Sequence, residues 1–224
     1  MRKLIKGIVD FRERHLPEYA ERFRELAQGQ APDVLFITCS DSRIVPELLA
    51  STDPGDLFVV RNVGNMVPPA TPSGVSTGDL SEASALEFSI LMLKVRYVVV
   101  CGHSECGAMK AALASKPMPE TPNLTNWLHY AASAVFRLDQ EGALDPRLER
   151  HNQLSQLNVL VQLEHLASYP LVRQRMATGT LQLSGWWFNI ATGEVSAYDQ
   201  ESRTFQTIDR AFAERLLQRF TLSD

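Results

Sequence analysis

Cysteine is scarce in this sequence: the 224 residues contain only Cys39, Cys101 and Cys106. A fold held together by disulfides usually has more cysteines, in an even number. The count therefore argues against a disulfide framework, and we expect a protein of a reducing, cytoplasmic compartment.

Long apolar runs and blocks of like charge are also missing. No stretch reaches the roughly 20 apolar residues of a membrane span. The first residues, MRKLIKGIVDFRERHL, carry charges every few positions and so lack the continuous apolar centre of a signal peptide. The net charge is −4 and is spread along the chain. We therefore expect neither nucleic acid nor a membrane as a partner.

No stretch rich in glycine, serine or proline divides the chain into comparable halves. We therefore expect a single domain over residues 1–224, with residues 1–30 as an N-terminal helical arm. Residues 3–28 place apolar side chains at roughly helical spacing among charges, and Pro17 interrupts the pattern. Two amphipathic helical segments are predicted here, packed on the body or on a partner chain.

Three short apolar runs rich in β-branched residues are typical of buried strands. They span residues 33–39, 56–62 and 97–102. A helical pattern at 82–94 separates the second run from the third, and another follows at 106–115. Strands that alternate with helices predict an α/β fold with a mostly parallel central sheet flanked by helices.

The rest of the sequence predicts further helices and a late hairpin. Helical patterns occur at 126–138, 152–166, 170–177 and 209–220. A strand at 180–190, a turn at ATGEV and a second strand at SAYD form the hairpin.

Candidate metal ligands stand where two of the strands end. Cys39 closes the first strand, and His103 and Cys106 follow the third. Ligands of such sheets lie beyond the carboxyl ends of the strands, so these three side chains are candidates for one site. Cys101 lies inside the third strand, and we assign it to packing rather than to a ligand role.

Two cysteines and one histidine are a donor set for zinc that leaves a fourth position open for water or substrate. The soft donors disfavour magnesium and calcium, which prefer oxygen. Alternatively, Cys39 and Cys106 are small buried hydrophobes. That reading weakens because both lie at strand ends beside charged residues.

The stretch CSDSR, residues 39–43, adds a carboxylate and a guanidinium beside the first candidate ligand. Arg43 has the planar fork that binds a carboxylate through two hydrogen bonds, so we expect it to hold Asp41 away from the metal. The alternative is a helix-capping aspartate with a surface ion pair.

These motifs resemble those of the β-class carbonic anhydrases. CSDSR, PGDLFVVRNVGNMVPP and CGHSECGAMK are similar to the main sequence blocks of that family, in the same order, and the resemblance covers nearly the whole chain. It implies one Zn²⁺ per chain on Cys39, His103 and Cys106. It also implies a catalytic pair, Asp41 and Arg43.

The resemblance implies an enzyme that hydrates carbon dioxide reversibly to bicarbonate and a proton by a zinc-bound hydroxide, whose proton Asp41 accepts or orients. It further implies a homodimer or larger homo-oligomer with active sites at the subunit interface. Two other functions remain open. One is hydrolysis of carbon disulfide or carbonyl sulfide at the same site, and the other is a catalytically silent zinc-binding regulatory protein.

By the same resemblance, the substrate-binding residues are Gln30, Phe58, Phe88 and Gly107. The amide of Gln30 would hydrogen-bond substrate oxygens, and the two phenyl rings would form a dry wall. For Phe58 and Phe88 the alternative is ordinary core packing.

Some relatives carry a regulatory bicarbonate pocket, and its positions correspond here to Phe36, Arg61 and Phe188. Two of its three polar groups are therefore absent. We predict an open site at neutral pH, with Asp41 a metal ligand in the closed state only. The segment 68–88 departs most from the family pattern, and we expect it near the mouth of the pocket.

Overall fold

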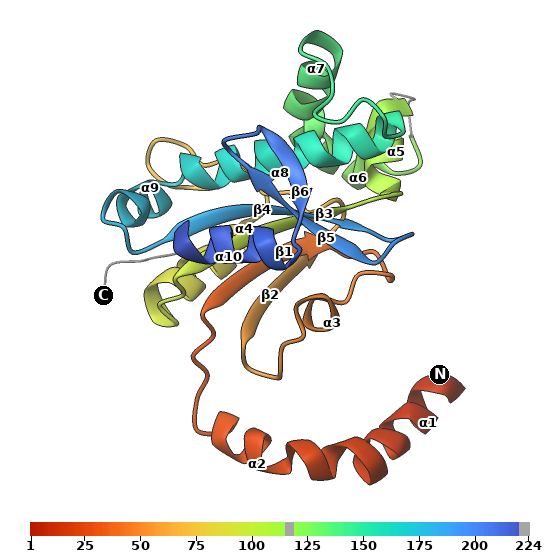
Figure 1. The fold of residues 1–224 in the computed structure, drawn as a ribbon, viewed down its shortest axis with the longest axis vertical. Coiled ribbons are helices and arrows are strands. Elements are labelled where there is room, and N and C mark those ends of the chain that lie inside the picture. The colour runs from red at the N-terminus through yellow and green to blue at the C-terminus, as the bar shows by residue number, and fades with distance from the viewer. Residues whose placement is uncertain (115–118, 220–224) are drawn as a thin grey trace.

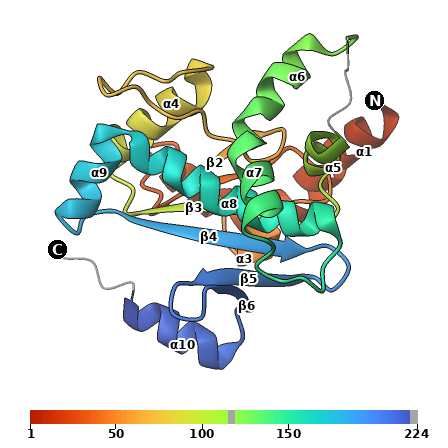
Figure 2. The same cartoon turned by 90° about the horizontal axis from the view of Figure 1, so that it is seen from above.

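The computed structural model describes residues 1–114 and 119–219. Six strands form one sheet in the order β2-β1-β3-β4-β5-β6, with β2, β1, β3 and β4 parallel and the last two antiparallel (Figures 1 and 2). The strands are β1 Val34–Cys39, β2 Leu57–Asn62, β3 Tyr97–His103, β4 Gln182–Asn189, β5 Glu194–Asp199 and β6 Thr204–Thr207. The predicted α/β fold with a mostly parallel sheet is confirmed.

The helices follow the predicted segments closely. The α-helices are α1 Arg2–Asp10, α2 Leu16–Leu26, α3 Pro46–Ala50, α4 Leu80–Glu87, α5 Gly107–Ala114, α6 Pro122–Leu128, α7 Ala132–Gln140, α8 Arg150–Ser168, α9 Pro170–Ala177 and α10 Arg210–Arg219. Short π or 3-10 turns are η1 Phe11–His15, η2 Phe88–Met92 and η3 His129–Ala131. Residues 115 and 220, to which two predicted helices extend, lie outside the described residues. Neither α3 nor β6 is predicted by the sequence patterns.

One face of the sheet packs on helices α4, α8 and α9. Alternate residues of β1 and β3, such as Leu35 and Val98, point to this face because side chains of a strand alternate. They contact Leu86 of α4 and Val159 of α8 in one buried cluster. In Figure 2, α8 runs along β4 on the side opposite α10. The long helix α8 thereby lies over the strand that carries His103.

The other face holds a second apolar cluster around Phe36, Val99 and Cys101. The ring of Phe36 meets Trp186 edge-on, with 5.9 Å between the ring centroids. Cys101 is fully buried, and burial raises the pKa of its thiol to about 12. Its surroundings agree with the packing role predicted for this cysteine.

The arm consists of α1, η1 and α2 in unbroken succession, and it extends away from the sheet (Figure 1). Pro17 stands in the first turn of α2, directly after the wider π turn, where its missing N–H is tolerated. Arg22 ties the arm to the body, because its Nη2 donates to Asp56 Oδ1 at 2.9 Å and its Nε donates to the carbonyl of Pro54 at 3.0 Å. Within residues 1–114 and 119–219, no helix combines the length and the hydropathy needed to cross a membrane.

Candidate metal centre

The fold brings Cys39, His103 and Cys106 together. Their ligand atoms all lie within 4.8 Å of one another, and all three side chains are buried. β1 and β3 are neighbouring parallel strands, so their carboxyl ends meet at one edge of the sheet. Cys39 and His103 are the last residues of these two strands, and Cys106 immediately precedes α5.

His103 has the geometry of a metal ligand. The side chain is fully buried, and its Nδ1 donates to the carbonyl of Ser104 at 2.8 Å. This bond places the ring proton on Nδ1 and leaves the lone pair of Nε2 available. Nε2 is buried and has no hydrogen-bond partner, which is costly unless a cation binds there. The donor set and this unpartnered atom therefore fit a metal ion.

The two thiols of the site interact with each other. A hydrogen bond from Cys106 lowers the pKa of Cys39, and the backbone N–H of Gly64, 3.4 Å from Cys39 Sγ, acts in the same direction. The hydrogen bond to Cys39, together with burial, raises the pKa of Cys106. One thiolate forms readily and the second resists, because two adjacent negative charges repel. A bound cation would remove this repulsion.

Asp41 and Arg43 form the bidentate pair that the sequence suggested. Arg43 Nε donates to Oδ1 at 2.8 Å and Nη2 donates to Oδ2 at 2.7 Å. The same guanidinium holds the pKa of Asp41 well below its usual range, so the carboxylate stays ionised. Asp41 Oδ2 lies 3.9 Å from His103 Nε2, which places the carboxylate beside the candidate metal position.

Arg61, at the end of β2, braces the segment that carries these groups. Its Nε donates to the carbonyl of Cys39 at 3.2 Å, and its Nη2 donates to the carbonyl of Asp41 at 2.7 Å. The positions of Phe36 and Phe188, which correspond to the other two groups of the regulatory pocket, belong instead to the apolar cluster beneath the sheet. Arg61 thus holds the backbone of the segment that carries Cys39 and Asp41.

The backbone around His103 is fixed by the interior of the protein. Ser155 Oγ of α8 donates to the carbonyl of His103 at 2.8 Å, and Trp187 Nε1 donates in turn to Ser155 Oγ at 3.1 Å. Gly102 allows this approach, because a Cβ there would lie 2.7 Å from a methyl group of Val159. These contacts fix the position of the His103 backbone relative to α8.

Three of the four predicted substrate-binding residues do not join the metal centre within one chain. Gln30 precedes β1, and Phe58 stands opposite Leu35, near the amino end of the sheet. Phe88 packs against Phe58, with 5.8 Å between the ring centroids. Phe58 is four residues before the partner of Cys39, which is about 13 Å along the strand. Gly107 does lie beside Cys106, and a Cβ there would meet nothing within 4 Å.

Several residues around the site are not indicated by any sequence motif. His151 and Asn152 both hydrogen-bond to Glu105, in the turn between the two candidate ligands. Residues 105 and 151 are 46 positions apart, so no local pattern in the sequence points to their contact. Ser155 was part of a predicted helix, without any indication that it contacts His103.

The first part of the divergent segment 68–88, residues 68–79, packs on the junction between α8 and α9. The backbone N–H of Ala70 donates to Ser168 Oγ at 2.7 Å, and Tyr169 Oη donates to the carbonyl of Pro68 at 2.8 Å. Glu82, in the first turn of α4, lies nearer the candidate site because its Oε1 accepts from Asn62, the register partner of Cys39.

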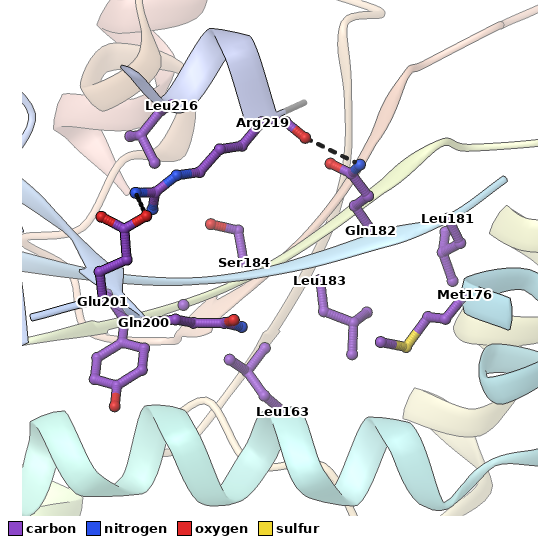
Figure 3. Close-up of a pocket in the computed structure, with 12 residues that line it drawn as sticks. Leu163, Met176, Leu181, Gln182, Leu183, Ser184, Gln200, Glu201, Leu216 and Arg219 are labelled. Atoms are coloured by element: carbon purple, nitrogen blue, oxygen red, sulfur yellow. Dashed lines mark hydrogen bonds and ion pairs between the residues drawn. The ribbon is translucent and has the colours of Figure 1, made fainter. Parts of the chain in front are cut away.

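A separate cavity of about 490 Å³ lies between α8, β4 and α10 (Figure 3). Leu163, Ser184 and Leu216 line it, and its only described guanidinium, that of Arg219, already pairs with Asp199 and Glu201. None of the three candidate metal ligands lines this cavity. This cavity is therefore not part of the candidate metal centre.

Comparison with known proteins identifies the family to which the chain belongs. The sequence model of the carbonic anhydrase family matches residues 34–195, which include all three candidate ligands. The chain belongs to the carbonic anhydrases. A carbonic anhydrase of Synechococcus elongatus is 41% identical over 211 residues, which cover 93% of this chain and 75% of the relative. One of Pseudomonas aeruginosa is 39% identical over 215 residues, which cover 93% and 92%.

Solved structures place this carbonic anhydrase in the β class. The β-carbonic anhydrase CcaA superposes with a TM-score of 0.83 at 37% identity, covering 92% of this chain and 98% of that one. A β-carbonic anhydrase of Sordaria macrospora, described as tetrameric, superposes with a TM-score of 0.74 at 29% identity, covering 88% and 95%. The resemblance drawn from the sequence motifs is thereby confirmed at the level of family and fold.

Proposed function

We propose that this protein is a zinc enzyme that hydrates carbon dioxide reversibly to bicarbonate and a proton. One observation carries the proposal. Cys39, His103 and Cys106 converge in a buried site where His103 Nε2 lacks a partner and lies 3.9 Å from the ionised Asp41. Membership of the β-class carbonic anhydrases supports the choice of metal and substrate.

The two thiols and the imidazole would hold one zinc ion. When bound, zinc supplies Lewis acidity that makes water a nucleophile near neutral pH, a principle for which three-histidine carbonic anhydrases are the standard example. Asp41, ionised and beside the candidate metal position, would accept a hydrogen bond from that water and orient it. Arg43 keeps the carboxylate ionised and binds both of its oxygens, so Asp41 would not itself act as a ligand of the zinc.

A homodimer would complete the substrate pocket. Gln30, Phe58 and Phe88 lie near the amino ends of β1 and β2, away from Cys39. In the proposed dimer they line the site of the second chain. Phe88 is 44% exposed although it is a large apolar ring. Val45 and Leu48, which follow the candidate ligand segment, are also exposed. Exposed apolar side chains near both ends of the strands support burial by a second copy of the chain.

Stopped-flow hydration of carbon dioxide, on protein with measured zinc content, tests this function. The variants are Cys106→Ser, which removes a proposed ligand, and Asp41→Ala, which removes the carboxylate beside it. Cys101→Ala is the matched control, since that thiol is buried in the second apolar cluster. We expect activity and one zinc per chain in the wild type and in the control. Cys106→Ser should lose both, and Asp41→Ala should keep zinc and lose activity.

A wild-type chain that holds zinc but does not hydrate carbon dioxide would refute the proposed reaction. Carbonyl sulfide and carbon disulfide would then be assayed on the same preparation, because both are small linear molecules open to the same attack. Inertness toward all three would favour the regulatory alternative.

A further inference from the structure

Glu105 occupies the turn between two proposed zinc ligands, and its side chain is bound on both oxygens. Oε1 accepts from His151 Nε2 at 2.8 Å and from Asn152 Nδ2 at 3.1 Å, and both donors stand at the start of α8. Oε2 accepts from Lys110 of α5. The carboxylate thus connects the turn to two helices, α5 and α8.

The backbone of Glu105 is bound as well. Its N–H donates to Asn152 Oδ1 at 2.7 Å, and its carbonyl accepts from Arg43 Nη2 at 3.1 Å. Arg43 is the group that holds Asp41. Residue 105 therefore joins the His103–Cys106 turn to the catalytic pair through a direct hydrogen bond.

This turn needs support, because its conformation is unfavourable for a residue with a side chain. Glu105 has a φ of +58°, in the left-handed region that glycine adopts most easily. The chain must reverse here so that His103, at the end of β3, and Cys106, just before α5, face one point. A glutamate stays in this conformation only where surrounding contacts hold it.

We propose that Glu105 is a positioning residue of the metal centre. Its carboxylate, fastened to Lys110, His151 and Asn152, fixes the turn that presents His103 and Cys106 to zinc and that anchors Arg43. This inference rests on the proposed zinc site, and it adds a residue outside the ligand set and the catalytic pair. Groups that orient metal ligands typically change metal affinity about 10- to 100-fold when they are removed.

The test compares the rate of zinc release to a chelator in Glu105→Ala, Glu105→Gln and wild type. Glu105→Ala should release zinc about 10- to 100-fold faster. Glu105→Gln keeps an oxygen acceptor for His151 or Asn152 and should recover part of the loss. Glu164→Ala is the matched control, since that carboxylate of α8 also pairs with a basic side chain, that of Arg137. It lies 12 residues beyond Asn152 on the same helix, which is about 18 Å along the helix axis. It should release zinc at the wild-type rate.

Replacement of zinc by Co²⁺ distinguishes a positioning role from a merely stabilising one. The visible absorption of bound Co²⁺ reports ligand geometry, and it should change in Glu105→Ala and less in Glu105→Gln. His151→Ala removes one anchor without altering the turn and should release zinc faster too, which keeps the test possible if Glu105→Ala does not fold. Unchanged zinc release and cobalt spectra in the folded variants would overturn the proposal. Both readouts are independent of turnover, so they remain decisive even if the chain fails to hydrate carbon dioxide.

Discussion

At the scale of single residues, the candidate site depends on which atoms are left without partners. His103 has one nitrogen bound to a neighbouring carbonyl and the other buried and free. Asp41, by contrast, has both oxygens occupied by Arg43. A bound metal ion would give the buried Nε2 of His103 a partner, whereas the oxygens of Asp41 already have partners. This difference separates the proposed ligand from the proposed orienting group.

The fork of Arg43 gives a prediction at this scale. In Arg43→Lys the positive charge remains, but one ammonium group cannot make the two parallel bonds to Asp41 and the bond to the Glu105 carbonyl. We expect zinc content to stay at one per chain and kcat for carbon dioxide hydration to fall about tenfold or more. Stopped-flow kinetics with metal analysis measures both. Full activity in Arg43→Lys would show that only the charge of this residue matters.

At the scale of elements, α4 carries a buried acid next to the end of β2. Glu82 accepts from Asn62 Nδ2 at 3.0 Å through Oε1, while Oε2 is buried without a partner. Burial raises the pKa of this carboxyl, and the nearby Asp79 adds to the effect. The protonated form is therefore favoured by folding. Stability from this group is complete below the ordinary pKa and is lost as the pH rises through the folded pKa.

The variant Glu82→Gln tests this direction of the pH dependence of stability. The amide keeps an oxygen for Asn62 and carries no charge, so the melting temperature of the zinc-loaded protein should exceed that of wild type by a few degrees at about pH 8. Near pH 4.5, the ordinary pKa, the two should coincide. Glu87→Gln, an exposed position on the same helix, is the control and should show no such trend. Equal melting temperatures of Glu82→Gln and wild type at both pH values would contradict the assignment.

At the scale of the whole molecule, the arm formed by α1, η1 and α2 has few contacts with the body of its own chain. Leu4, Ile5 and Ile8 are more than half exposed. Such a stripe is normally covered, and we propose that residues 1–30 act as an arm that packs on a second copy of the chain. The separation of Phe58 and Phe88 from the metal centre of their own chain supports the same arrangement.

Deletion of residues 1–28 should therefore convert the oligomer into monomers or aggregates, as measured by sedimentation velocity. Ile5→Glu combined with Ile8→Glu in the full chain should have the same effect, because two charges would be buried in the interface. Lys3→Ala with Lys6→Ala alters the polar residues of the same helix and should leave the oligomer intact. An intact, active dimer without the arm would defeat this proposal.

The sequence located most elements because their patterns are local. β1, β2 and β3 begin and end within one residue of the predicted runs, since continuous apolar residues between polar ends are typical of buried parallel strands. β6 has four residues and α3 has five, too few for a period to stand out. These two form because β5 offers an edge and because Pro46 starts a helical turn after the ligand segment.

The sequence by itself determined the donor types of the site, because a thiol, an imidazole, a carboxylate and a guanidinium are properties of single residues. It also determined their order along the chain and hence the family. Only the tertiary structure decided that His103 Nε2 is unpartnered, that Glu105 is held by His151, and that Phe58 lies at the far end of the sheet from Cys39. Each of these facts depends on how segments far apart in the sequence pack against one another, which no local pattern records.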